Sequence, residues 1–147
     1  MAMEHLEFMR RAYGEALRSF EMGGVPVGSV LVRAGQVVGA GHNQRVQKSD
    51  PIAHGEMDCL RNAGRLRSYR DTVIYTTLAP CMMCTGTIIQ FKIPTVVIGE
   101  SVNFPGNKDL LRDHGVEVID LEDRGCIELM ARFIRERPEL WNEDIAE

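Results

Sequence analysis

The stretch TVIYTTLAPCMMC, residues 72–84, decides the fold of this chain. Its first six residues are all β-branched or aromatic, which favours a strand. Pro80 suits the first position of a helix, so the strand is expected to lead directly into a helix. Cys81 and Cys84, three residues apart, then share one face of the first turn, where the helix N-terminus helps to keep thiolates deprotonated. This arrangement predicts two sulfur ligands for one metal ion.

A second short stretch, His54-Gly55-Glu56, is expected to lie at the start of another helix, where both side chains fan around the open helix end. One imidazole and two thiolates suit Zn²⁺, and three protein ligands leave the fourth tetrahedral position for a water molecule. Glu56 is close enough to His54 to reach that water without being a ligand, so it could move protons. The sequence therefore predicts one catalytic zinc ion held by His54, Cys81 and Cys84.

Two structural interpretations of the cysteine pair compete with this one. A redox pair would leave His54 and Glu56 without a role. A closed zinc knot needs a fourth ligand, and the remaining histidines have no ligand-like spacing to the pair. Pro-Cys-x-x-Cys is also rare by chance, whereas His-x-Glu alone is common. These points favour an open, reactive zinc site.

The rest of the chain alternates between helical and strand-like segments. Helices are expected over residues 3–22, 53–63, 80–91, 107–114 and 122–137, and strands over residues 27–32, 37–41, 72–77, 95–99 and 116–121. This alternation implies parallel crossover connections and an α/β fold. Pro138 is expected to break the last helix before a short tail. We expect one domain, residues 1–147.

Composition disfavours several functional classes. The chain has 17 basic and 21 acidic residues, a net charge of -4, which disfavours a nucleic-acid partner. No apolar run approaches the length of a membrane span, so no membrane partner is expected. The other two cysteines, Cys59 and Cys126, lie in helical patterns where buried thiols are common, and no disulfide is needed. We therefore expect a cytoplasmic enzyme with a small substrate.

The two motifs together resemble the cytidine deaminase superfamily, in which His-x-Glu and Pro-Cys-x-x-Cys form the zinc signature. Longer segments resemble the fungal, yeast-type cytosine deaminases: GGVPVG at 23–28, GHNQR at 41–45, YTTLAPCMMCTG at 75–86, VNF at 102–104 and ERPELWNEDI at 136–145. The resemblance implies a three-layer α/β/α sandwich with a central mixed five-stranded sheet, a homodimer, and hydrolysis of free cytosine to uracil and ammonia.

The resemblance also implies roles for residues that carry little signal alone. Asn43 and the backbone N–H of Gly55 would hold the carbonyl of the base, and Asp144 would accept a hydrogen bond from a ring N–H. Phe104 and Trp141 would cover the ring, so that residues 138–147 form a lid. Without the resemblance, the sequence favours a structural interpretation of these side chains, as a turn residue, core packing or a solvated charge.

Three departures from the fungal pattern leave other substrates open. Met82 stands where the fungal proteins have an acidic residue, Ala79 replaces a serine, and residues 49–51 differ. The alternatives are another free amino-heterocycle such as guanine and, less favoured by the acidic composition, adenosine in transfer RNA. A zinc-stabilised interaction module without catalysis is a further alternative, but it would not need Glu56.

Overall fold

Five strands form one mixed sheet in the order β2-β1-β3-β4-β5 in the computed structural model, which describes residues 2–147. The strands are β1 (Gly28–Arg33), β2 (Gln36–His42), β3 (Thr72–Thr76), β4 (Thr95–Ile98) and β5 (Glu117–Asp120). β1 is antiparallel to both β2 and β3, whereas β3, β4 and β5 are parallel. The predicted crossovers and the predicted five-stranded mixed sheet are confirmed.

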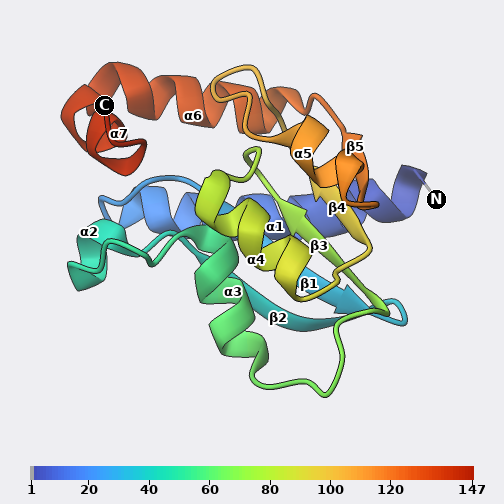
Figure 1. The fold of residues 1–147 in the computed structure, drawn as a ribbon. Coiled ribbons are helices and arrows are strands. Elements are labelled where there is room, and N and C mark those ends of the chain that lie inside the picture. Colours follow the sequence, from blue (N-terminus) through green and yellow to red (C-terminus); the bar gives the residue numbers. More distant parts are fainter. Residues whose placement is uncertain (1) are drawn as a thin grey trace.

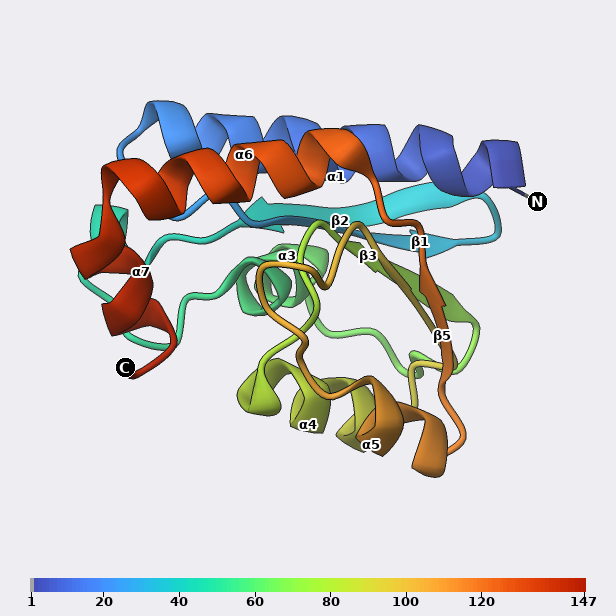
Figure 2. The same cartoon turned by 90° about the horizontal axis from the view of Figure 1, so that it is seen from above.

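Helices cover both faces of this sheet (Figure 1). α1 (Ala2–Glu21) and α6 (Arg124–Glu136) lie on one face, and α3 (Gly55–Ala63), α4 (Met82–Gln90) and α5 (Lys108–Asp113) lie on the other, as Figure 2 shows from above. The short helices α2 (Arg45–Lys48) and α7 (Pro138–Asp144) lie together beyond the strand ends where β1 begins and β2 ends. The three-layer sandwich is therefore confirmed.

Successive side chains of a strand point to opposite faces of the sheet, so the core is divided into one apolar layer on each face. Leu31, Ile74 and Val96 pack against α3, α4 and α5, while Val30 and Val97 pack against α1 and α6. The inner strands β1, β3 and β4 bury both of their faces, as expected for a sheet between two helical layers, whereas the edge strands β2 and β5 are partly exposed. A third apolar cluster, which includes Phe133 and Trp141, joins α6 and α7 to the loops that border the site described below.

Close backbone contacts fix α3 against the sheet. A Cβ atom on Gly41 of β2 would lie 2.5 Å from the backbone nitrogen of Cys59 in α3. Only glycine allows this approach without a shift of the helix. The N-terminus of α3 is thereby held beside the ends of β1 and β3, where the predicted metal ligands lie.

Two local expectations are corrected by the structure. The helix after β3 begins at Met82, with Cys81 as its N-cap, so Pro80 lies before the helix in an extended connection. The reason is that the chain continues strand-like pairing after β3, where the Ala79 N–H donates to the Glu100 carbonyl at 3.0 Å. The expected tail after Pro138 is instead the helix α7, which Pro138 begins because its missing N–H is not needed there.

None of the helices in residues 2–147 is both long and apolar enough to cross a membrane.

Candidate active site

The predicted metal ligands meet where the N-termini of α3 and α4 approach each other. His54 is the N-cap of α3 and Cys81 is the N-cap of α4, and both have extended backbone conformations. Cys84 lies in the first turn of α4 and is fully buried. α3 follows the connection from β2, and α4 follows the connection from β3. Both helices begin on the same side of the sheet, so His54 and Cys81 come together although they are 27 positions apart in the sequence.

The ligand atoms have the spacing that a tetrahedral ion requires. His54 Nδ1 lies 3.4 Å from Cys81 Sγ and 4.0 Å from Cys84 Sγ. Ideal zinc–sulfur and zinc–nitrogen bond lengths at a tetrahedral angle place sulfur and nitrogen about 3.6 Å apart. Within the described residues this group contains three members, and Glu56 is not among them. The site therefore fits zinc with one coordination position left for a small ligand.

Before metal binds, the ligands share protons. A hydrogen bond with Cys84 lowers the pKa of Cys81 to about 4, and the same hydrogen bond raises the pKa of Cys84 well above its usual value. Burial acts to lower the pKa of His54, but Cys81, Asp144 and Glu56 together raise it to about 9. A metal ion must therefore displace protons from Cys84 and His54 when it binds.

Glu56 lies in the first turn of α3, beside the ligands, with only 4% of its surface exposed. Burial raises the pKa of Glu56 to about 7, the charge of Cys81 adds to this rise, and His54 opposes it. A proton carrier is most effective when its pKa lies near the working pH. The geometry and the pKa of Glu56 both suit it to proton transfer.

A cavity that is partly open to solvent adjoins the ligand group. Eight of its lining residues were already named from the sequence or from the resemblance: Asn43, His54, Gly55, Glu56, Ala79, Cys81, Phe104 and Asp144. The cavity therefore brings these residues together beside the metal ligands.

Asn43 presents a hydrogen-bond donor to this cavity. Its Oδ1 accepts from the backbone N–H of Arg45 at 3.0 Å, which fixes the orientation of the amide. The Nδ2 group therefore points the other way, where it donates to Asp144 Oδ1 at 3.0 Å. The backbone of Asn43 is also held, because its N–H donates to the Val27 carbonyl and its carbonyl accepts from the Ser19 hydroxyl.

Asp144 provides a hydrogen-bond acceptor at the cavity. Its side chain is 7% exposed, and Oδ1 lies 3.7 Å from His54 Nε2 and 3.9 Å from Arg45 Nε. Burial raises the pKa of Asp144, while His54 and Asn43 act to lower it. The cavity thus has a fixed donor and a fixed acceptor, side by side, from segments 101 residues apart.

The two aromatic residues have different positions. Phe104 lines the cavity, whereas Trp141 is 6% exposed and packs behind it, with ring centroids 6.2 Å apart and planes at 87°. Trp141 thus supports Phe104 in this structure rather than lining the cavity itself.

The backbone of Gly55 approaches the end of β1 closely. A Cβ atom at this position would lie 2.9 Å from the Val27 carbonyl oxygen. Gly55 is the first residue of α3, so its N–H is one of those that have no acceptor within the helix. A side chain here would push the helix end away from β1 and displace both His54 and Glu56.

Several residues that line the cavity were not predicted from the sequence. Val27, Leu78 and Ile145 complete the apolar wall of the cavity. The positions of Val27 and Leu78 could have been predicted, because Val27 precedes β1 and Leu78 follows β3. These strands are antiparallel neighbours, so the start of one lies beside the end of the other. Arg45 was also missed, although it pairs with Glu143 at 3.4 Å and so links α2 to α7.

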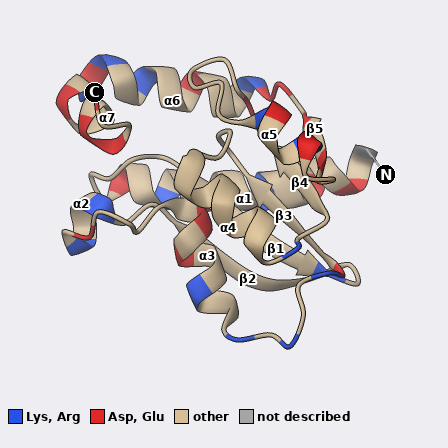
Figure 3. Cartoon of the chain, in the orientation of Figure 1, with Lys and Arg blue, Asp and Glu red and all other residues tan. Residues whose placement is uncertain are grey.

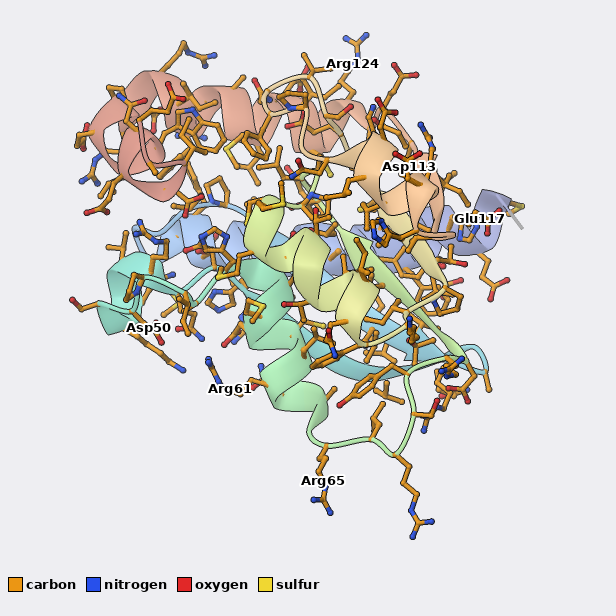
Figure 4. All side chains as sticks on the ribbon, in the orientation of Figure 1. Asp50, Arg61, Arg65, Asp113, Glu117 and Arg124 are labelled. Atoms are coloured by element: carbon orange, nitrogen blue, oxygen red, sulfur yellow. The ribbon has the colours of Figure 1, made fainter. Side chains whose placement is uncertain are left out.

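Charges around the mouth of the cavity are mixed. Acidic side chains gather on α7, and basic residues of α2 lie close by (Figure 3). The arginines Arg61 and Arg65 lie at the far end of α3 and beyond it, where they point into solvent (Figure 4). The residues that line the mouth include one arginine, Arg45, and two acidic residues, Glu143 and Asp144.

The fold and this metal site together define a zinc-dependent deaminase domain. The family model for the cytidine and deoxycytidylate deaminase zinc-binding region matches residues 2–100, and the chain belongs to this family. A cytosine deaminase from Candida albicans is 49% identical over 150 residues, covering 100% of both chains.

Two other proteins are similar to this chain at lower identity. A tRNA-specific adenosine deaminase from Streptococcus pyogenes is 33% identical over 150 residues, covering 90% of this chain and 91% of its own length. The structure of a guanine deaminase from Bacillus subtilis has a TM-score of 0.61 and 32% identity, covering 64% of this chain and 62% of that one.

Proposed function

We propose that this chain is a zinc-dependent hydrolase that converts free cytosine to uracil and ammonia. The observation that carries the proposal is the pairing of the Asn43 donor with the Asp144 acceptor in one small cavity beside Glu56 and the metal ligands. The full-length identity to a cytosine deaminase supports the same substrate.

Cytosine matches the hydrogen-bonding groups of the cavity. Its carbonyl oxygen can accept from Asn43 Nδ2 and from the Gly55 N–H, and its ring N1–H can donate to Asp144. Phe104 and Ile145 cover the ring, and Leu78 and Val27 pack around it. These contacts orient the amino-bearing carbon toward the metal ligands.

Glu56 carries the protons of the reaction. When bound, zinc supplies a water molecule that is activated for attack at neutral pH. Glu56 accepts a proton from the attacking water and delivers it to ring nitrogen N3 as the new bond to C4 forms. Glu56 then carries the proton of the new C4 hydroxyl to the exocyclic amino group, so that the C4–N bond breaks, ammonia leaves and the C4 carbonyl of uracil forms. A pKa near neutrality lets one carboxyl group serve as both base and acid.

Asp144 supports the choice of free base over nucleoside. In cytidine, N1 carries ribose and no hydrogen, so the carboxylate would lose its donor and meet the sugar. An unpaired buried acceptor and a steric clash both act against the nucleoside. Guanine has two fused rings and needs more space than cytosine, which disfavours it as the substrate. A transfer RNA substrate needs an open basic surface, which the acidic residues of α7 do not provide.

We further propose that residues 138–147 act as a lid within a single catalytic domain, because Asp144 and Ile145 reach the cavity from the C-terminal segment. A cytoplasmic location is part of the proposal, because Cys81 and Cys84 must stay reduced to bind zinc. An alternative that the site does not favour is a non-catalytic module, which would have no use for a buried Glu56.

A homodimer is also proposed, through the outer face of α4. The residues of this helix carry no charge, and Met82, Gly86 and Phe91 are exposed on or beside it. A Cβ atom at Gly86 has no neighbour within 4 Å, so Gly86→Glu leaves the monomer undisturbed. We expect this variant to sediment as a monomer and the parent as a dimer; an unchanged dimer would place the interface elsewhere.

The variant Glu56→Gln tests the proposed function. Zinc per chain should stay the same, while the rate of ammonia release from cytosine should fall by about 10²- to 10⁴-fold, the usual contribution of general acid–base catalysis. Turnover near that of the parent, with zinc bound, would show that Glu56 does not carry the protons.

A further inference from the structure

A buried carboxylate outside the metal site is not explained by the reaction. Glu100 follows β4 and is 0% exposed, yet within residues 2–147 it forms no ion pair with a lysine, arginine or histidine. Burying a carboxylate is unfavourable unless hydrogen bonds compensate for the lost hydration. Its partners should therefore show what it does.

All of its side-chain partners lie in the loop that leads to Phe104. Glu100 Oε1 accepts from the backbone N–H of Val102 at 2.7 Å and from that of Asn103 at 2.9 Å. Oε2 accepts from Asn103 Nδ2 at 2.9 Å, and the same amide donates to the Ile127 carbonyl of α6 at 3.0 Å. The carboxylate thus folds the turn directly before Phe104, and the Asn103 amide, which the carboxylate orients, fastens that turn to α6.

The backbone of Glu100 holds a second wall of the cavity. Its carbonyl accepts from the Ala79 N–H at 3.0 Å. Ala79 lines the cavity and lies two residues before the metal ligand Cys81. Figures 1 and 2 show the loop after β4 running beside the loop after β3, at the carboxyl edge of the parallel strands. One residue therefore connects the loops that carry Phe104 and Cys81.

We propose that Glu100 is a positioning residue of the active site, which holds Phe104 against the substrate ring through the turn at Val102 and Asn103. This inference rests on the proposed function for the identity of the substrate. Glu100 does not touch the cavity, so it acts through Phe104. A fixed Phe104 contributes binding to substrate and transition state alike, and its loosening raises KM more than it lowers kcat.

The variant Glu100→Gln tests this assignment. Glutamine has one acceptor oxygen, so its NH₂ group faces at least one of the three N–H donors and the turn loosens. We expect KM for cytosine to rise about tenfold with kcat within about threefold of the parent. Zinc per chain should be unchanged. Glu117→Gln, an exposed glutamate on β5, is the matched control and should match the parent in KM.

Fluorescence gives a readout that is independent of the substrate. Trp141 is the only tryptophan of the chain and packs edge-on against Phe104. Loosening of Phe104 should increase quenching of Trp141 by acrylamide in Glu100→Gln and not in Glu117→Gln. If the parent does not deaminate cytosine, the proposed function fails, and the quenching result still decides the role of Glu100.

A second, milder variant keeps the test informative if Glu100→Gln does not fold. Asn103→Ala removes the Nδ2 donor and its link to α6 but keeps the carboxylate and two of its hydrogen bonds. It should show a smaller rise in KM and in quenching. A lower melting temperature with unchanged KM and quenching would make Glu100 a residue of global stability and overturn the proposal, as would failure of both variants to fold. Loss of zinc in parallel with activity would instead assign Glu100 to the Cys81 loop alone and also overturn it.

Discussion

Replacement of Asp144 by asparagine removes one charge from the cavity with almost no change in shape. In the parent, Oδ1 accepts from Asn43 Nδ2 at 3.0 Å, and the carboxylate remains able to accept from a ring N–H. An amide at position 144 must turn its oxygen toward Asn43, which leaves its NH₂ group facing the ring N–H of cytosine. A hydrogen bond to a charged group contributes about 2 to 3 kcal/mol, so kcat/KM should fall about 30- to 150-fold.

The assay is loss of cytosine absorbance in parallel with ammonia release, with zinc in excess, because Asp144 also lies near His54. Glu139→Gln is the matched control, because Glu139 lies on the same helix and pairs with Arg137 at the surface. Its kcat/KM should stay within about twofold of the parent, as expected for an exposed ion pair. A loss below about threefold in Asp144→Asn, or an equal loss in Glu139→Gln, would refute the assignment.

Three further predictions concern stability and the metal. Removal of zinc by a chelator should lower the melting temperature by about 8 °C if zinc was present at 100 times its dissociation constant, and added zinc should restore it; no shift would mean that the α3 and α4 ends are held without metal. Gly55→Ala should lower both the melting temperature and activity, because its Cβ would meet the Val27 carbonyl; activity equal to that of the parent would show that the helix end moves without consequence. Burial opposes ionisation of Asp120, but hydrogen bonds from Ser101 and Lys108 outweigh it and lower its pKa, so its contribution to stability is present above the unfolded-state pKa and is lost as pH falls through the folded-state pKa. Asp120→Asn should therefore lose less stability on acidification below about pH 4 than the parent does, measured by urea unfolding.

The metal ligands could be predicted from the sequence because their geometry is local. Cys81 and Cys84 are three residues apart at a helix start, and His54 opens a second helix, so the element boundaries alone nearly determine where they point. The exact start of α4 could not be predicted, because the pairing of Ala79 with Glu100 across two loops keeps Pro80 outside the helix.

The cavity depends on contacts between distant segments, and these were beyond the sequence. Asn43 and Asp144 are 101 residues apart, and only the resemblance suggested that they meet. Arg45 has the composition of a surface residue, yet it connects α2 to α7. Glu100 follows an apolar strand and would be expected to face solvent, but its partners Val102 and Asn103 become visible only once the loop has folded.

The most direct test of the central claim is ammonia release by the zinc-loaded protein from cytosine, cytidine, guanine and adenosine, each at the same concentration. The geometry of Asn43, Asp144 and Glu56 predicts release from cytosine, with cytidine far slower because N1 carries ribose. Release from guanine or adenosine without release from cytosine would contradict the proposed substrate.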